Sequence, residues 1–244
     1  MTRAGRFAVK QQPQSATIGD VIFGPFLFIY VVLFFAVLAF LFALIEIHVI
    51  NYAFTLAGLP PELAFLALLG SLIGSYINIP VARLQCRIPH QTALISSYGV
   101  RYRPPVGRWD GSTVLAINVG GAVVPVLIAL YILIHQPELV GPALIATAIV
   151  GLVVNRTARP IRGLGIATPM FIPPIIAAVA GYMLGGPGHS APIAYIGGVL
   201  GTLIGADIMN IGRLSELGAP VASIGGAGTF DGIFLTGIVA VLLA

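Results

Sequence analysis

Residues 192–211 read PIAYIGGVLGTLIGADIMNI, and this stretch predicts the class of the fold. A helix needs about 20 mainly apolar residues to cross the ~30 Å hydrocarbon core of a bilayer. The chain contains further apolar runs at about 23–50, 62–81, 113–134, 142–155 and 166–184, and from about 225 to 244. We therefore expect an all-α, polytopic integral membrane helical bundle with about seven transmembrane helices.

The composition excludes an ordinary soluble protein. The residues AVILMFWYC make up 58% of the chain and DEKR only 8%, against roughly a quarter charged in a typical globular domain. We expect a cytoplasmic tail at 1–22 and a single transmembrane domain at 23–244. The single cysteine, Cys86, excludes an internal disulfide and a cysteine-based metal cluster.

The basic residues predict the orientation. All twelve Lys and Arg residues fall in the N-terminal tail, in the loop at 82–112, or in the segments after 142–155 and 192–211. The three opposite connections, at 51–61, 135–141 and 185–191, contain none. Cytoplasmic flanks of membrane spans carry the excess of Lys and Arg. We therefore expect a plasma-membrane protein with its N-terminus inside, its C-terminus outside and the lipid bilayer, not nucleic acid, as the partner of its positive charge.

Glycines predict how the span at 192–211 packs. Gly197, Gly201 and Gly205 recur every four residues, so they form one ridge that a neighbouring helix can approach closely. Asp207 lies about 200° around the helix from Gly205, which predicts protein contacts on both sides of this span. The sequence after Ile224 (Gly-Gly-Ala-Gly) also echoes Val119-Gly-Gly-Ala, a hint of an internal repeat.

Two aspartates fall within apolar runs, where an ionisable group is costly and indicates function. Asp207 is expected about 6 Å from the cytoplasmic end of its helix, and Asp231 about 9 Å from the same membrane face if the last helix begins near Gly225. Two such carboxylates on adjacent antiparallel helices could share one proton. A pair of this kind suits general acid and base activation of water against a peptide carbonyl. The alternative is that each aspartate only fixes packing through hydrogen bonds.

The residues around the aspartates carry a resemblance. Asp207 follows Gly205-Ala206, and Gly226-Ala-Gly-Thr-Phe-Asp231-Gly-Ile-Phe opens the last run. This pattern is similar to the intramembrane aspartyl proteases, the presenilin, signal peptide peptidase and prepilin peptidase group. In this chain Thr229 and Phe230 stand between the Gly-x-Gly element and the aspartate. The resemblance implies that Asp207 and Asp231 are catalytic and that a membrane protein or peptide is the substrate.

Over its full length the chain resembles an uncharacterised family of bacterial and archaeal membrane proteins, the domain of unknown function sixteen-fourteen. The ending Gly-Ala-Gly-Thr-Phe-Asp-Gly-Ile-Phe carries this resemblance.

We expect the substrate to contact four residues near the aspartates or beside broken helices, namely Gly226, Gly228, Asn210 and Asn118.

Two other classes of function stay open. Helices broken by proline and glycine, with buried carboxylates, are also typical of proton- or sodium-coupled transporters. Asn155 would then join Asn118, Asn210 and the aspartates as ligands, and a homo-oligomer would supply further spans. The third class is a non-catalytic subunit of a larger membrane complex, which the glycine ridges would suit.

We expect no cofactor and no metal. The only lysine is Lys10, which excludes a phosphate-binding loop, and no full dinucleotide fingerprint is present. His48, His135 and His189 are each on a different segment, so they form no ligand pair at i, i+4 spacing. These histidines are expected at the outer face of the membrane near glutamates, so binding of zinc or copper stays an open alternative.

The first prediction concerns orientation. Cysteine introduced as Arg103→Cys, in a Cys86→Ser background, should react with a membrane-impermeant thiol reagent only after the cells are opened, because the loop at 82–112 is expected inside. Labelling of this cysteine from outside intact cells would contradict the predicted orientation.

Overall fold

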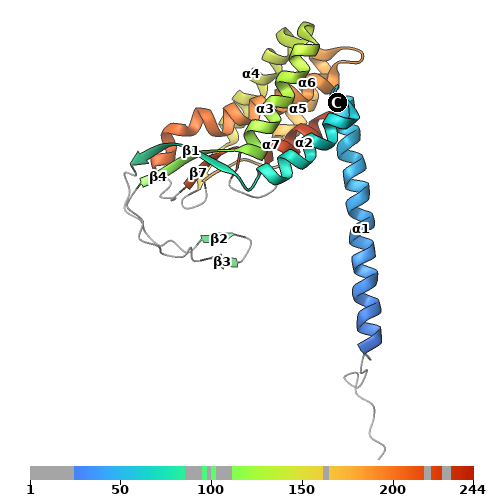
Figure 1. Ribbon diagram of the computed structural model, residues 1–244. Coiled ribbons are helices and arrows are strands. Elements are labelled where there is room, and N and C mark those ends of the chain that lie inside the picture. Colours follow the sequence, from blue (N-terminus) through green and yellow to red (C-terminus); the bar gives the residue numbers. More distant parts are fainter. Residues whose placement is uncertain are drawn as a thin grey trace, which may run out of the picture. The chain divides into compact units, whose positions relative to one another are not determined.

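The computed structural model describes residues 25–85, 95–97, 100–102, 112–161, 165–216, 221–226 and 232–244 (Figure 1). The chain forms two compact units, residues 1–46 and 47–244. The first unit contains the N-terminal part of α1 (Pro25–Leu56), whose apolar side chains between Val32 and Leu38 are exposed. A helix that is apolar on all sides suits a lipid environment. The expected tail at 1–22 lies outside the described residues.

The second unit is mainly helical, as the sequence predicted. Its helices after α1 are α2 (Pro61–Gly74), α3 (Val124–His135), α4 (Val140–Thr157), α5 (Ile172–Gly185), α6 (Ser190–Thr202) and α7 (Gly232–Leu243). Shorter turns extend three of them. The π turn η2 (Val119–Val123) leads into α3 and the 3₁₀ turn η3 (Pro137–Leu139) leads into α4, while the π turn η4 (Leu203–Asp207) and the 3₁₀ helix η5 (Ile208–Glu216) continue α6.

Two helical segments are long and apolar enough to cross a membrane, at Pro137–Thr157 and Ser190–Leu214. A third candidate is the bent pair Glu46–Leu56 and Pro61–Gly74, which turns by 120° at its break. Shorter apolar helices cover Val119–His135, Ile172–Gly185 and Gly232–Leu243. These features are those of a membrane protein with two or three candidate spans among the described residues, and the seven-span count stays a prediction.

Helix α6 lies at the centre of the second unit. Every residue from Pro192 to Val199 is buried. A Cβ atom added to Gly197 would lie 2.7 Å from the Cβ of Ala146, and one added to Gly201 would lie 2.6 Å from the Cβ of Val150. The predicted glycine ridge is therefore confirmed, and α4 is the helix that packs against it.

The contacts fix the directions of the helices. Along α4 and α6 the contacting positions rise together, from Ala146 with Gly197 to Gly151 with Gly205, so these two helices are parallel. On α5 the order is reversed, because Gly181 contacts Ala194 while Gly198 contacts Ala177. Helices α4 and α6 consequently end at the same side of the unit.

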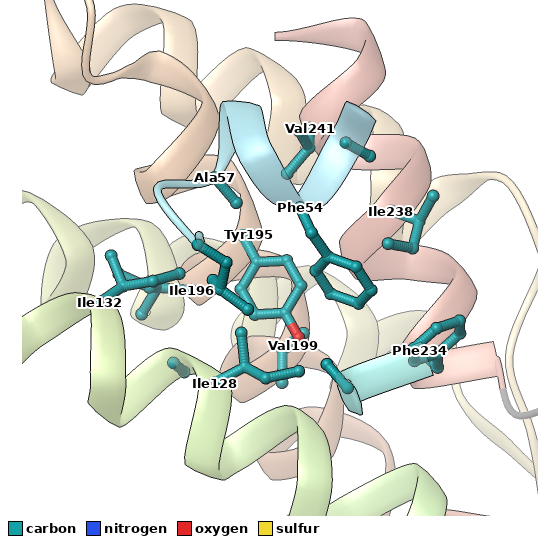
Figure 2. Close-up of a cluster of buried hydrophobic side chains, with 14 of the residues drawn as sticks. Phe54, Ala57, Ile128, Ile132, Tyr195, Ile196, Val199, Phe234, Ile238 and Val241 are labelled. Atoms are coloured by element: carbon teal, nitrogen blue, oxygen red, sulfur yellow. The ribbon is translucent and has the colours of Figure 1, made fainter. Parts of the chain in front are cut away.

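Aromatic side chains close the core beside α6. Tyr195 is fully buried against Phe54 of α1, with ring centroids 6.1 Å apart, and Phe54 contacts Phe234 of α7 edge to face at 5.9 Å (Figure 2). Gly237 makes room for the Tyr195 ring, since a Cβ there would lie 2.8 Å from its Cε2. The C-terminal part of α1, which belongs to the second unit, is thus packed into the core.

A three-stranded sheet lies at the end of the second unit where α4 and α6 finish. Its order is β1 (Asn78–Gln85), β4 (Ser112–Asn118) and β7 (Val221–Ile224). Strand β1 pairs antiparallel with β4, and β4 pairs parallel with β7. The register of β1 shifts between Pro80 and Ala82, as expected where proline removes a ladder donor.

The sheet corrects two predicted helix boundaries. The second span was predicted to reach Val81, but α2 ends at Gly74 and β1 follows. The third was predicted to begin near Thr113, which is in β4. The last was predicted to begin near Gly225; Gly225 and Gly226 are not helical, residues 227–231 lie outside the described residues, and the described helix α7 is Gly232–Leu243. A short apolar run is compatible with a buried strand or with a helix, so hydropathy could not separate them. The all-α expectation is wrong at these segments.

Two small strand pairs complete the description. Strand β2 (Ile95–Ser97) pairs with β3 (Val100–Tyr102), and β5 (Arg159–Ile161) pairs with β6 (Gly165–Ala167), both antiparallel. The first pair falls in the predicted basic loop at 82–112, of which 86–94, 98–99 and 103–111 lie outside the described residues.

The glycine ridge gives the second prediction. Gly201→Ala should destabilise the protein by about 1–3 kcal/mol, because the added methyl group overpacks the contact with Val150. Gly141→Ala on α4 is the matched control, since a Cβ there has no neighbour within 4 Å and should gain helix propensity. Unfolding titrations in mixed micelles measure both. Equal effects of the two variants would contradict the proposed packing.

Candidate functional site

Asp207 is the last residue of the π turn η4, where the regular helix α6 gives way to the 3₁₀ helix η5. Single π turns inside helices occur frequently at functional sites. Asparagine side chains bind the carbonyl groups at this break. Asn210 Nδ2 donates to the carbonyls of Gly205 and Ala206, each at 3.0 Å, and Asn155 Nδ2 donates to Gly205 O at 3.2 Å.

The carboxylate of Asp207 is tied to the end of β7. Its Oδ2 accepts a hydrogen bond from the backbone N–H of Gly225 at 2.8 Å. Gly225 has φ of +83°, a conformation that favours glycine, and a Cβ there would lie 2.7 Å from the Cβ of Ala122. Glycine at this position therefore lets the strand end turn close to η2 while its N–H points at Asp207.

A cavity of about 150 Å³ lies beside Asp207. Its walls come from the end of α6 with η4 and η5, from β7 and the turn after it, from the start of α7, and from the β6 region. The lining residues are Thr202, Ala206, Asp207 and Leu214; Val221, Ala222, Ser223, Ile224 and Gly226; Gly232 and Ile233; and Ile166 and Thr168. One carboxylate, several hydroxyl groups and a strand backbone thus share an otherwise apolar space.

Two of the six predicted site residues line this cavity, Asp207 and Gly226. Asp231 and Gly228 lie outside the described residues, so the distance between the two carboxylates stays a prediction. By sequence, Asp231 directly precedes Gly232, which lines the cavity and is the first residue of α7. Asn210 and Asn118 are not among the lining residues, and their contact with substrate also stays a prediction.

Asn118 instead connects the sheet to η2. It is 1% exposed, and its Nδ2 donates to Ser75 O at 2.7 Å and to Asn78 Oδ1 at 3.1 Å, while its Oδ1 accepts from Gly121 N at 2.7 Å. Asn78 Oδ1 also accepts a 2.6 Å hydrogen bond from Ser223 Oγ of β7. These bonds link all three strands to the start of the π turn.

The two glycine pairs of the suggested repeat lie close together. Ile117 pairs with Ile224 at the ends of the parallel strands β4 and β7, and each strand continues into a Gly-Gly sequence. Gly225 lies against Gly121 and Ala122, which belong to the other segment of the suggested repeat in the same chain. The similarity in sequence therefore corresponds to two adjacent strand ends, although a true repeat stays a prediction.

The histidines are placed apart from this cavity. His135 Nδ1 lies 2.9 Å from Tyr131 O, and the His135 ring packs on the Tyr131 ring with centroids 4.0 Å apart. Within the described part of the chain, no group of three or more His, Cys, Asp or Glu residues is placed to hold a metal ion. Metal binding by His48 or His189 stays an open prediction.

Sequence reasoning missed the strand β7 and the polar residues Thr202 and Ser223. The four residues Val-Ala-Ser-Ile are too short to reveal a strand, and only the β-branched residues at both ends hinted at one. Thr202 is an ordinary residue for a membrane helix. Only its place among the lining residues of the cavity beside Asp207 distinguishes it.

The fold and the cavity together define a mainly helical membrane protein with a carboxylate at a break in its central helix. The chain belongs to the family described as Protein of unknown function (DUF1614), whose model matches residues 72–243. No curated protein and no solved structure matches the chain. The similarity to intramembrane aspartyl proteases therefore depends on the quoted residues alone.

The asparagine network gives the third prediction. Asn118→Ala should cost about 2–4 kcal/mol of stability, because three hydrogen bonds are lost and buried partners are left unpaired. Asn155→Ala, which removes one 3.2 Å bond in a partly buried place, should cost about 1 kcal/mol. The free energy of unfolding in micelles measures both, and a smaller loss for Asn118→Ala would exclude this role.

Proposed function

We propose that the protein is an intramembrane aspartyl hydrolase that cleaves peptide bonds with Asp207 and Asp231 as its catalytic pair. The observation that supports this most is the cavity, whose lining residues include both Asp207 and Gly232, the sequence neighbour of Asp231. Asp231 directly precedes Gly232 in the sequence, so the two residues share a peptide bond.

The proposal includes the full topology, with seven spans, the N-terminus inside and the C-terminus outside in the plasma membrane. It also includes the cytoplasmic tail at 1–22, the transmembrane domain at 23–244 and the cytoplasmic loop at 82–112. Support comes from Arg156 at the end of α4 and Arg213 in η5, since these parallel helices end on the same side. Arg159 in β5 follows the end of α4, and Arg83 is in β1 of the sheet whose strand β7 lines the cavity together with the end of α6.

In this mechanism one aspartate is ionised and the other is protonated. The ionised carboxylate accepts a proton from water as the water oxygen bonds to the peptide carbonyl carbon, and the protonated carboxyl group donates its proton to the carbonyl oxygen. A proton then passes to the leaving nitrogen, the C–N bond breaks, and a carboxylic acid and an amine are formed. Each catalytic cycle consumes one water molecule and leaves the pair with one proton.

The proposed substrate is a membrane protein or peptide in extended form. Strand β7 is at the edge of the sheet, and its four residues line the cavity. An extended segment can add to such an edge through main-chain hydrogen bonds. The apolar walls formed by Ala206, Ala222 and Leu214 would accept small uncharged side chains next to the bond that is cut.

A proton- or sodium-coupled transporter is the second candidate. The observation that favours it is the change of α6 into η4 and η5 at Asp207, because broken helices supply ion sites in many carriers. Under this alternative Asp207 would bind the coupling ion and a homo-oligomer would form the complete carrier.

The fourth prediction separates these functions. Asp207→Asn and Asp231→Asn should each abolish cleavage of a membrane-spanning peptide by purified protein in liposomes, because either change leaves a pair that cannot both accept and donate a proton. Activity of the unchanged protein should be greatest at the pH where the pair holds one proton. Mass spectrometry of the products measures cleavage.

The matched control is Glu138→Gln, an acidic residue in η3 that is exposed and far along the chain from the cavity. It should retain activity, and unfolding titrations should show that all variants are folded. Flux measurements in proteoliposomes test the transporter alternative. Solute flux that loses its coupling to a proton or sodium gradient in Asp207→Asn, with no peptide cleavage by the unchanged protein, would favour the transporter.

A further inference from the structure

Three arginines adjoin a small apolar cluster that packs the sheet against η5. The cluster consists of the buried residues Leu115, Leu214 and Ala222 with the partly buried residues Leu84, Ile166, Ile211 and Ile224. Each arginine directly precedes a residue that belongs to the cluster or pairs with one of its members: Arg83 precedes Leu84, Arg213 precedes Leu214, and Arg159 precedes Pro160, the register partner of Ile166. We call these three arginines, which come from β1, η5 and β5, the basic shell.

The side chains of the basic shell are all exposed. In a strand, neighbouring residues point to opposite faces, so Arg83 points away from the side on which Leu84 packs. Long basic side chains lie along apolar surface while their charged groups stay in polar surroundings. The guanidinium groups of the basic shell are therefore accessible to a partner outside the protein.

The acidic side chains described in the second unit lie mostly at its other end. Glu62 is in the first turn of α2, whose last residues lead into β1, and Glu138 is in η3, which leads into α4. The 18 residues of α4 separate Glu138 from the start of β5 by about 27 Å at 1.5 Å per residue. Asp207 is nearer to the basic shell, and its Oδ2 accepts the hydrogen bond from Gly225. Three arginines thus outnumber one described carboxylate at this end of the unit.

The basic shell lies where two candidate membrane spans end. Arg213 is next to the last residue of the segment Ser190–Leu214, and Arg159 follows the segment Pro137–Thr157 by two residues. Exposed apolar side chains accompany the arginines, since Val81 is 50% and Ile161 is 38% exposed. A lipid presents acyl chains and a phosphate side by side at the membrane surface, which matches apolar side chains next to cations. A soluble anion would match the cations alone.

We propose that the basic shell binds the headgroup phosphates of anionic membrane lipids. Its guanidinium groups donate charge-assisted hydrogen bonds to phosphate oxygens, while the acyl chains cover Val81 and Ile161. The cavity beside Asp207 shares Leu214 and Ala222 with the apolar cluster, so the bound lipids lie close to the candidate site. This inference goes beyond the proposed function and does not rest on it, because lipid binding requires neither catalysis nor transport.

Native mass spectrometry of the full chain in micelles tests this surface with phosphatidylglycerol and phosphatidylcholine of identical acyl chains. The unchanged protein should bind phosphatidylglycerol more tightly. The triple variant Arg83→Gln/Arg159→Gln/Arg213→Gln should reduce this preference about a hundredfold, because each arginine near an anionic membrane surface contributes about fivefold. Inorganic phosphate, which lacks acyl chains, should not displace the bound phosphatidylglycerol.

The matched control is Arg3→Gln/Arg6→Gln/Lys10→Gln, which removes the same charge from the N-terminal tail. It should keep most of the preference for phosphatidylglycerol. Equal losses in the two triple variants would show an effect of net charge alone and would overturn the binding surface. If unfolding titrations show that the variant of the basic shell is not folded, Arg159→Gln alone should still lower the preference about fivefold.

Other outcomes also decide the matter. An unchanged preference in the folded variant, or displacement of the lipid by inorganic phosphate, would overturn the inference. Binding of an acidic peptide to the basic shell with no preference between the two lipids would assign the surface to a protein partner instead. The measurement uses no cleavable substrate, so its failure leaves the proposed function standing, and a lack of peptide cleavage beside normal lipid binding rejects the proposed function alone.

Discussion

The close contact between α4 and α6 is the interaction on which the rest of the second unit depends. Gly197, Gly201 and Gly205 bring α6 so near to α4 that added methyl groups would overlap atoms of that helix. In a membrane, helices associate through such packing, because lipid chains are as apolar as the helix surfaces. With one side of α6 fixed in this way, its other faces receive α5, α7 and the end of α1.

Much of this arrangement could be predicted from the sequence. The helical character, the positions of most helices and the glycine contact follow from local patterns of apolar and small residues. The sheet could not be predicted in the same way, because Val114 pairs with Val221, more than a hundred residues away in sequence. Hydropathy reports how apolar a segment is, and strands within a membrane protein can be as apolar as its helices.

The candidate site was predicted in part. Asp207 stood out because a carboxylate within an apolar run is costly, and the cavity beside it agrees with that reasoning. Asn118 and Asn210 were predicted to contact the substrate because they lie beside broken helices or near the aspartates, and in the structure their amides bind backbone groups at the two π turns. A polar side chain in an apolar run therefore marks either a ligand site or an irregular backbone, and only the tertiary contacts separate the two.

The hydrogen bond between Gly225 and Asp207 makes the cavity dependent on the sheet. Gly225 is held by the pairing of β7 with β4 and by its contact with Ala122, so the strand register determines where its N–H points. That N–H in turn orients the carboxylate at the break in α6. Every lining residue lies between 166 and 233, and the strands β1 and β4 that support them also lie within the matched range 72–243. The cavity is thus built and supported by the part of the chain that defines the family, whereas α1, which ends at Leu56, lies outside that range.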